Sequence, residues 1–407
     1  MYNTIYIMKY IKIENDKIPI DTTEFFWCAG RSNIPKGIFD LVNLECLWLD
    51  ENSGIGDIPE NIKKLTKLEC LALGYNYHKC IPSAIFNLYS LKSLNMDNND
   101  ISEIPSDICK LKNLKYLDLS NNKLNNVPRS LLQISLVDLN LSHNKFKSIP
   151  NILFDIVSLE NLNMSNNFII EISEKITKLI NLKYLNLFSN PIKKICDSFW
   201  NLKLKSLPVE ISNEHIDEIC NITTLETLSS PNLNEISEKI CNLINLKYLC
   251  LYQSCIKNIP NNISKLIKLK NLTISGNISN MENICKLFNL TYLNLNKNNI
   301  SFVPEEINNL KFLTDLRMSY NKMYDMTNIC KIPSLISLYL NNNKINIVPT
   351  EIKNMINLNN LDISNNNISN IPLQLRELKN LKHLYISNNY ICELPEKITD
   401  SNLKNFF

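Results

Sequence analysis

The sequence predicts an α/β fold of the solenoid type, in which short parallel strands stack along one face and the chain returns along the other. Three observations predict it. The phrase Leu-x-x-Leu-x-Leu-x-x-Asn, followed by Ile-x-x-Ile-Pro-x-x-Ile-x-x-Leu, recurs along the chain, its copies begin 21 to 24 residues apart, and no long insertion separates them. Self-similarity at such a period is typical of repeat architectures.

The repeated phrase divides most of the chain into units. One regular copy opens at Leu91 and the next at Leu114, so the period there is 23 residues. A solenoid of such units grows linearly, so a chain of 407 residues needs no second core. The first leucines of the 16 units are Leu44, Leu68, Leu91, Leu114, Leu136, Leu159, Leu182, Leu204, Leu225, Leu246, Leu269, Leu290, Leu313, Leu335, Leu358 and Leu381.

The first half of each unit predicts a strand. In Leu-x-x-Leu-x-Leu the second and third leucines alternate with another residue, and successive side chains of a strand point to opposite faces. Strands of successive units should stack in parallel, about 4.8 Å apart. We expect this parallel β-sheet on the concave face of a curved horseshoe.

The second half of each unit predicts the return segment on the convex face. It should be extended and then form about one turn of helix. Proline, as in Ile104-Pro105, suits the start of such a turn because its φ is fixed and no amide donor is required there. One unit cannot close a core alone, so neighbouring units must stabilise one another.

An asparagine follows the strand phrase in most units. Backbone groups at the point where strands turn need hydrogen-bond partners, and a carboxamide supplies both donors and an acceptor. We therefore expect a buried ladder that satisfies the backbone, in preference to a ligand-binding role. Its predicted members are Asn76, Asn99, Asn122, Asn144, Asn167, Asn190, Asn277, Asn298, Asn321, Asn343, Asn366 and Asn389.

The ends of the chain predict caps. Residues 1–43 are interpreted as an N-terminal cap with a degenerate first repeat from about Asp21, because Ile34-Pro35 matches the return half of a unit. The repeat domain is expected over residues 44–402 and a tail over residues 403–407. The residues available to cover the two ends of the core are Ile5, Ile7, Tyr10, Ile11 and Ile13, and then Leu403, Phe406 and Phe407.

The pattern is irregular over residues 204–254. Pro208 lies inside one strand phrase, Asn232 is displaced from the ladder position of the next, and Ser254 replaces the ladder asparagine of the third. Two interpretations stay open. This stretch is either a kink or hinge of low stability, or a set of units that have drifted under little constraint.

The composition argues against several functions. The 43 basic and 40 acidic residues are interspersed, with a net charge of +3, so no single-sign patch predicts binding to nucleic acid. No apolar stretch of about 18 residues predicts a membrane span, and the first ten residues lack the apolar run of a signal peptide. The 13 cysteines are scattered singly. A reduced, cytoplasmic protein is expected.

No constellation of residues predicts catalysis, a cofactor or a metal. The sequence has no Gly-x-Ser-x-Gly, no phosphate-binding glycine-rich loop and no paired-cysteine metal spacing. The four histidines lie in different units, and His78 and Cys80 have no companion ligand in the sequence around them. We therefore expect a protein that is not an enzyme and has no small-molecule substrate.

Candidate binding residues are the surface positions of the strand phrase, since solenoids commonly bind partners on the concave face. Tyr, Trp and Arg are enriched at binding hot spots. Tyrosines of the common Leu-x-Tyr-Leu phrase, such as Tyr292, are discounted. The first candidate surface is Arg317, Tyr339, Asp362 and Tyr385, flanked by Asp315, Tyr320 and His383. The second, which is acidic and aromatic, is Trp48, Asp50, Glu51 and Tyr75, with Glu45 and Glu69.

The whole pattern resembles leucine-rich repeats, and its return half resembles the intracellular Ras-suppressor-like class of 23-residue repeats. The resemblance runs from about Asp21 to Asn402, although Ser173, Cys196 and Ser237 replace the proline. It implies scaffolds that bind small GTPases, phosphatase subunits or other signalling proteins. The motifs that carry it are Ile104-Pro105, Val127-Pro128, Ile149-Pro150, Ile259-Pro260, Val348-Pro349 and Ile371-Pro372.

These observations favour a non-catalytic scaffold for protein–protein interaction, expected to be monomeric, with a protein partner whose identity the sequence does not give. The alternative is a regulatory or substrate-recruiting subunit of a phosphatase, a small-GTPase pathway or a ubiquitin-ligase complex. A docking helix of the F-box kind within residues 1–43 would favour a ligase, and the sequence shows none. An enzyme is disfavoured by the missing constellation.

Overall fold

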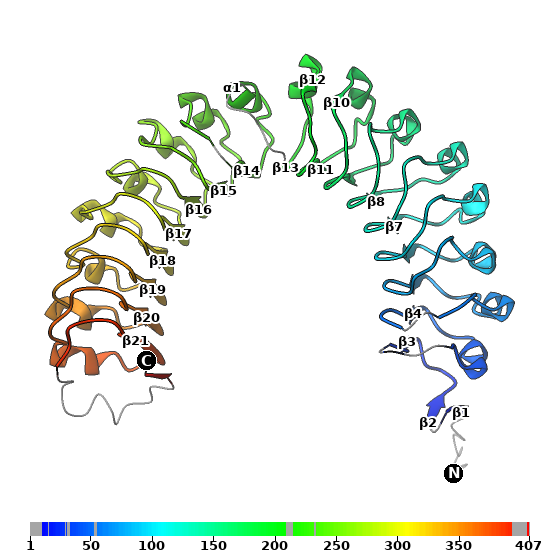
Figure 1. Ribbon diagram of the computed structural model, residues 1–407, viewed down its shortest axis with the longest axis horizontal. Coiled ribbons are helices and arrows are strands. Elements are labelled where there is room, and N and C mark those ends of the chain that lie inside the picture. Colours follow the sequence, from blue (N-terminus) through cyan, green and yellow to red (C-terminus); the bar gives the residue numbers. More distant parts are fainter. Residues whose placement is uncertain are drawn as a thin grey trace, which may run out of the picture. The chain divides into compact units, whose positions relative to one another are not determined.

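The computed structural model describes residues 10–14, 16–28, 30, 33–52, 55–208, 215–231, 233–392 and 405–406. The chain forms two compact units, residues 1–204 and 205–407. Within each unit, short parallel strands line one side and the helical turns lie on the opposite side (Figure 1). The predicted α/β solenoid is confirmed for each unit.

The first unit begins with a β-hairpin. β1 (Tyr10–Ile13) pairs antiparallel with β2 (Asp16–Pro19). Ile13 is buried, and the backbone of β1 packs so closely on the first helical turn that a Cβ added to Gly37 would lie 3.0 Å from the carbonyl oxygen of Lys12. Tyr10, Ile11 and Ile13 therefore lie in a strand, and its role as a cap stays a prediction. The predicted cap residues Ile5 and Ile7 fall outside the described residues.

The main sheet of the first unit is parallel and pairs residue for residue. One of its rows contains Phe26, Trp48, Ala72 and Asn95. β10 (Glu171–Ile172) and β12 (Lys194–Ile195) form a separate parallel pair on the return side. The strands of the main sheet are β3 (Glu24–Phe26), β4 (Cys46–Trp48), β5 (Cys70–Ala72), β6 (Ser93–Asn95), β7 (Tyr116–Asp118), β8 (Asp138–Asn140), β9 (Asn161–Asn163) and β11 (Tyr184–Asn186).

The sheet of the second unit is built in the same way. Its last strand contains Phe406, one of the expected cover residues, and pairs in parallel with β21. Leu403 and Phe407 fall outside the described residues. The strands are β13 (Ser206–Pro208), β14 (Thr227–Ser229), β15 (Tyr248–Leu251), β16 (Asn271–Ile274), β17 (Tyr292–Asn294), β18 (Asp315–Arg317), β19 (Ser337–Tyr339), β20 (Asn360–Asp362), β21 (His383–Tyr385) and β22 (Asn405–Phe406).

The return segments of the first unit contain short 3-10 helices. In η4 the amide of Ile108 donates to the carbonyl of Pro105 (3.1 Å), and the amide of Leu111 donates to that of Ile108 (3.1 Å). Proline thus lies directly before the helix, where its carbonyl begins the hydrogen bonding. These helices are η1 (Lys36–Asp40), η2 (Glu60–Lys64), η3 (Ser83–Asn87), η4 (Ser106–Lys110), η5 (Arg129–Gln133), η6 (Asn151–Asp155), η7 (Glu174–Lys178) and η8 (Asp197–Asn201).

The second unit repeats this arrangement with one difference. Among the described residues, α1 (Ile216–Ile219) is the one α-helical turn, and it lies within the irregular stretch. The 3-10 helices contain three or five residues each, and such helices occur mainly as short pieces. The remaining helices are η10 (Glu238–Asn242), η11 (Ile263–Lys265), η12 (Ile284–Lys286), η13 (Glu305–Asn309), η14 (Ile329–Lys331), η15 (Thr350–Asn354) and η16 (Leu373–Glu377).

The apolar residues of the repeated phrase form the core of each unit. Leu91, Leu94 and Met96 of one repeat are at most 1% exposed, and so is Ile108 on its return segment. Full burial of such a side chain stabilises the fold by about 1.5–3 kcal/mol. Because each repeat contributes the same set, burial accumulates with every neighbour added.

The asparagine ladder is confirmed. Asn144 shows the pattern: its Nδ2 donates to the carbonyls of Leu119 (2.9 Å) and Leu141 (3.2 Å), and its Oδ1 accepts from the amide of Leu124 (2.8 Å). Each such side chain therefore joins two neighbouring repeats. Asn52, which was not among the predicted members, does the same by donating to the carbonyls of Trp27 and Leu49.

One predicted member of the ladder is wrong. Asn277 is exposed, and its Oδ1 accepts a hydrogen bond from Asn299. The reason is the length of its turn. Ile278 follows Asn277 directly, whereas Asn298 is separated from the equivalent Ile300 by one further residue. The shorter turn moves Asn277 out of the ladder position.

The irregular stretch keeps its strand pairing. β13 and β14 pair in register although Pro208 ends β13. Ser254 is buried, and its hydroxyl donates to the carbonyl of Ser275 (2.6 Å), so a side chain shorter than asparagine satisfies this position. Residues 209–214 and Asn232 lie outside the described residues. A hinge at 204–254 stays a prediction.

Candidate functional site

The strand side of the second unit carries the first candidate surface. β17 to β21 pair residue for residue, so side chains at equivalent positions form rows across the sheet. One row consists of Asn294, Arg317, Tyr339, Asp362 and Tyr385. The neighbouring row consists of Tyr292, Asp315, Ser337, Asn360 and His383.

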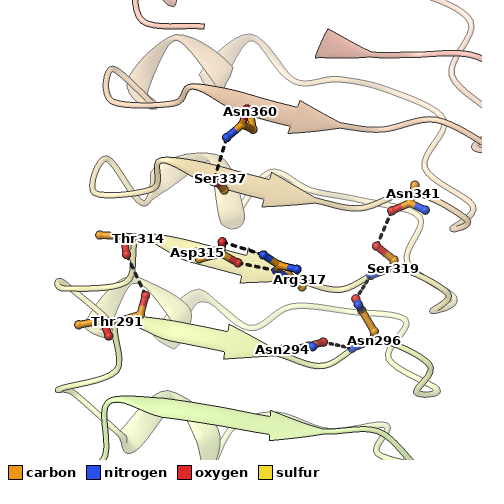
Figure 2. Close-up of polar contacts among 10 residues, drawn as sticks. All are labelled: Thr291, Asn294, Asn296, Thr314, Asp315, Arg317, Ser319, Ser337, Asn341 and Asn360. Carbon is orange, nitrogen blue, oxygen red and sulfur yellow. Dashed lines mark hydrogen bonds and ion pairs between the residues drawn. The ribbon is translucent and has the colours of Figure 1, made fainter. Parts of the chain in front are cut away.

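Arg317 is the best-positioned side chain of this surface. Its guanidinium donates to both carboxylate oxygens of Asp315, from Nε at 2.9 Å and from a terminal nitrogen at 3.3 Å (Figure 2). The guanidinium carbon also lies 5.3 Å from the ring centroid of Tyr292 and 4.9 Å from that of Tyr339. Arg317 is therefore held on its own strand and by both neighbouring strands.

These contacts fix the charge of Arg317 and its geometry. The hydrogen bonds to Asp315 raise the pKa of the guanidinium above its already high ordinary value. A bidentate pair and two aromatic rings restrict an otherwise flexible side chain. A partner would thus meet an ordered surface of one guanidinium and two phenol rings, with little side-chain entropy left to lose on binding.

The polar residues around Arg317 bond across the strands as well. The hydroxyl of Ser319 donates to Asn341, and its amide donates to the side chain of Asn296 (2.7 Å). Asn360 donates to the hydroxyl of Ser337 at 3.0 Å. In Figure 2 the bonds of Ser319 lie beyond the C-terminal end of β18, and the bond between Asn360 and Ser337 joins β20 to β19.

Tyr320 lies in the turn that follows β18. Its backbone has φ = 58°, in the left-handed region, and its side chain is 54% exposed. Asparagine is enriched in this conformation, whereas a bulky residue there is unusual. Asn98, Asn121 and Asn342 occupy the equivalent turn position in other repeats. A tyrosine in this place is therefore not required by the fold.

The other predicted members of this surface are not brought to Arg317. The carboxylate of Asp362 accepts from the amide (3.0 Å) and the hydroxyl (2.6 Å) of Ser364, so it caps its own turn. Tyr385 lies opposite Asp362, on the far side from Tyr339, and His383 pairs with Asn360. The surface is therefore centred on Arg317 and extends toward β21.

The second candidate surface lies on the strand side of the first unit. The ring of Trp48 stacks on Phe26, with centroids 4.1 Å apart and an angle of 4° between the planes. Phe26 is 63% exposed. Glu51 and Tyr75 both have positive φ in the turns that follow their strands. Two flat aromatic rings thus stand beside acidic side chains.

Asp50 and Asp97 share the space around Gly74. The carboxylate of Asp50 accepts from the amide of Gly74 at 2.7 Å. Burial raises the pKa of Asp50, and the charges of Asp97 and Glu51 add to that effect. Burial also raises the pKa of Asp97. These carboxylates are therefore easier to protonate than ordinary ones.

The described residues contain no cluster of three or more side chains that could hold a metal ion. His78 is buried, which lowers its pKa, whereas Cys80 is exposed. No nucleophile and base are brought together in the described part of either candidate surface. What these surfaces offer is contact: aromatic rings, a guanidinium, carboxylates and carboxamides.

Comparison with known families agrees with this architecture. Residues 76–168 and 277–364 match the family model described as a leucine-rich repeat region, and residues 181–202 and 380–401 match the leucine-rich repeat model. The chain belongs to the leucine-rich repeat family. Leucine-rich repeats are typically non-catalytic modules that bind proteins along an extended surface.

Solved structures with the same fold come from bacteria and plants. The chain is 30% identical to a leucine-rich repeat protein of Leptospira interrogans, covering 91% of this chain and 90% of that one, with a TM-score of 0.67. It is 26% identical to the ectodomain of the Arabidopsis thaliana receptor kinase GASSHO1/SCHENGEN3, solved with Casparian strip integrity factor 2, with a TM-score of 0.56. That match covers 88% of this chain and 51% of the receptor chain.

A second plant receptor gives a similar result. The Arabidopsis receptor kinase HAESA, solved with the peptide hormone IDA and the co-receptor SERK1, is 26% identical over 91% of this chain and 68% of that one, with a TM-score of 0.56. No curated protein matches the chain in a search of such proteins. Among the described residues, no helix of this leucine-rich repeat protein is both long and apolar enough to cross a membrane.

Two residues that make contacts in these surfaces are not among those that the sequence predicts. Tyr292 was discounted because it belongs to the common Leu-x-Tyr-Leu phrase, and its position diagonal to Arg317 depends on strand register and twist. Phe26 lies in the degenerate first repeat, which carries no leucine phrase. Aligning the degenerate repeat with the next one would place Phe26 beside Trp48, because the two residues pair across neighbouring strands.

Proposed function

We propose that this leucine-rich repeat protein is a non-catalytic scaffold that binds an extended polypeptide segment across the strand side of its second unit. Arg317 lies at the centre of the proposed contact. The observation that supports this most is the side chain's fixation by Asp315 and by the rings of Tyr292 and Tyr339. Tyr292 belongs to the common Leu-x-Tyr-Leu phrase, whereas the repeat does not require Asp315, Arg317 or Tyr339 at their positions.

The chemistry of the surface suits a peptide. Around Arg317 the rows contain hydroxyls and carboxamides, among them Asn294, Ser337 and Asn360, which can donate to and accept from peptide groups. The guanidinium between two phenol rings offers a flat face for one partner side chain. Tyr and Arg are the residues that most often dominate such contacts.

The two plant receptors favour the same mode. Each was solved with a protein or peptide ligand named with it, and each is 26% identical to this chain. In this proposal the protein partner is an extended segment of another chain, whose pathway is left to experiment. A phosphatase, small-GTPase or ubiquitin-ligase role would be one use of such a scaffold.

We further propose a cytoplasmic location. All 13 cysteines are free thiols, and unpaired cysteines in this number are typical of reducing compartments. The resemblance of the return segments to the intracellular Ras-suppressor-like class supports the same location.

The experiment is affinity purification from the native host with three baits in parallel. The first is the unaltered chain, the second carries Arg317→Ala, Tyr339→Ala and Tyr385→Ala, and the third carries Tyr116→Ala and Tyr184→Ala on the strand side of the first unit. Mass spectrometry identifies proteins that the first and third baits retain and the second loses. Calorimetry with the purified partner should then show binding weakened by more than roughly tenfold.

The third bait is the matched control, because Tyr116 and Tyr184 are half-exposed tyrosines of the same strand position as Tyr292. If every partner binds all three baits equally well, the assignment to Arg317 is wrong. A partner that only the third bait fails to retain would indicate that the contact lies on the first unit.

A further inference from the structure

The residue directly before the first leucine of a repeat is polar in the other repeats and aromatic in one, and the fold does not require this aromatic residue. The polar residue usually bonds to the preceding repeat. Asn113 donates to the carbonyl of Tyr89 (2.9 Å), and Asn289 donates to that of Ile267 (2.7 Å). The same bond is made by Asn181, Asn245, Asn357 and Asn380. In the repeat that starts at Leu313 this position is Phe312.

Phe312 lines a groove at the edge of the second unit where the strands begin. The groove has a volume of about 580 Å³ and spans the segments that lead into β15, β16, β17 and β18. Its apolar lining consists of Tyr248, Ile267 and Phe312, which are 48%, 64% and 61% exposed. Thr291, which Figure 2 shows just before β17 begins, also lines the groove.

The charge of the groove is positive. Lys247, Lys268 and Lys270 line it, and its lining contains no carboxylate. Lys247 is paired with Glu226 at 2.7 Å, which reduces its effect. Lys268 donates to the neutral side chain of Asn245 (2.8 Å), and among the described residues neither Lys268 nor Lys270 forms an ion pair. Two ammonium groups are thus left beside three exposed apolar side chains.

We propose that this groove binds a partner polypeptide through an apolar side chain that is next to an acidic residue. The apolar side chain packs on Tyr248, Ile267 and Phe312, and the carboxylate pairs with Lys268 and Lys270. The groove is an open surface feature, so it suits a side chain presented by an extended segment. This inference does not depend on the proposed contact at Arg317.

The energetics require both elements of the motif. Burying an aromatic or aliphatic side chain contributes more to affinity than an exposed ion pair does, because water screens the charges of the pair. The apolar contact therefore supplies most of the affinity. The lysines select acidic segments and oppose basic ones, because like charges repel at close range.

The test is a selection of displayed short random peptides on the full chain, run in parallel on Phe312→Asn and on Lys268→Glu with Lys270→Glu. Phe312→Asn installs the residue that seven other repeats carry, so the fold is expected to persist, and circular dichroism checks it. Sequences with an acidic residue beside a large apolar one should be enriched on the unaltered chain and absent from both variants. A selected peptide, measured by fluorescence anisotropy, should bind Phe312→Asn roughly tenfold more weakly.

Three further variants make the test specific. Phe288→Asn removes an exposed aromatic residue of the same edge that does not line the groove, Lys382→Glu reverses the lysine at the position of Lys270 in another repeat, and Arg317→Ala alters the other surface. All three should bind the peptide as the unaltered chain does. Enriched peptides that are basic, that bind Phe312→Asn undiminished, or that lose affinity equally in the controls would overturn the proposal, as would a selection without acidic–apolar enrichment.

Discussion

The carboxylate of Asp97 occupies the space that a side chain at position 74 would need, and Gly74 accommodates it by having none. A Cβ built on Gly74 overlaps one carboxylate oxygen of Asp97 and lies 3.1 Å from an oxygen of Asp50. Two carboxylates from neighbouring repeats thus converge on one glycine of the repeat between them. The absence of a side chain there keeps the acidic surface closely packed.

Gly74→Ala should destabilise the first unit. The added methyl group must displace Asp97, and forcing an extra methyl into a packed place costs about 1–3 kcal/mol. Urea unfolding measures the change. Gly56→Ala is the matched control, because nothing lies within 4 Å of a Cβ at that position. Equal midpoints for the two variants would contradict the packing described here.

Asn144→Ala should cost far more stability than Asn277→Ala. The first change leaves the carbonyls of Leu119 and Leu141 and the amide of Leu124 without their side-chain partner, and each buried unsatisfied group costs about 1–3 kcal/mol. Asn277 is exposed and outside the ladder, so its removal should stay within about 0.5 kcal/mol. Denaturant unfolding of the two variants compares these costs. A large loss of stability in Asn277→Ala would contradict its placement outside the ladder.

Hydrogen exchange should be fastest in the repeats that lack a ladder asparagine. Ser254 replaces it in one of these repeats, and in another Asn277 lies outside the ladder. The hydroxyl of Ser230, nearby, is buried and has no hydrogen-bond partner. Amides of β14 and β15 should therefore exchange faster than those of β8 and β9, as mass spectrometry of peptic fragments would show. Equal protection would favour drifted units over a hinge.

The stability difference between Asp97→Asn and the unaltered chain should depend on pH. Burial raises the pKa of Asp97 in the folded state, so the folded chain binds this proton more tightly than the unfolded chain does. The stabilisation is complete below the ordinary value of about 3.9 and is lost as pH rises through the higher folded value. The variant should therefore gain stability relative to the unaltered chain as pH rises above 4, in a series of urea unfolding curves. A difference that is flat with pH, or that falls, would contradict the raised pKa.

The cysteines should divide into two reactivity classes. Cys80, Cys255 and Cys392 are exposed, whereas burial raises the pKa of Cys220 and of Cys285 to about 12. Because the thiolate is the reactive form, iodoacetamide should modify the first three quickly in the native protein. Peptide mass spectrometry follows each site, with the urea-unfolded chain as the control that labels all 13. Labelling of Cys285 at the rate of Cys80 would show an opening that the fold does not predict.

The period of the repeat was enough to predict the strands, the core leucines and most of the ladder, because each depends on local spacing. Leu94 and Met96 are buried where alternation places them, and Asn144 joins its neighbours as a carboxamide should. The type of helical turn does not follow from the period. The helices are three or five residues long and have 3-10 hydrogen bonds. The repeated phrase alone does not distinguish such a helix from an α-helical turn.

The contacts of the candidate surface could be predicted only in part. Arg317 and Tyr339 share a row, which register alone places side by side. Tyr292 reaches Arg317 from the neighbouring row, and that diagonal depends on side-chain direction. One carboxylate oxygen of Asp362 accepts from the amide and the hydroxyl of Ser364 in its own turn, and a contact of Asp362 with a partner stays a prediction. Pairings inside one turn compete with contacts across strands, and the sequence does not show which prevails.

Phe312 also bears on how such a protein can change over generations. Its position holds Asn, Ser, Thr or Lys in the other repeats and Phe here, while the strands on either side keep their pairing. One substitution at this position can therefore add or remove an apolar contact while the other residues of the repeat stay the same. Duplication of such a repeat would copy the contact to a new place on the edge, so that partner choice can evolve in steps of one repeat under an unchanged architecture.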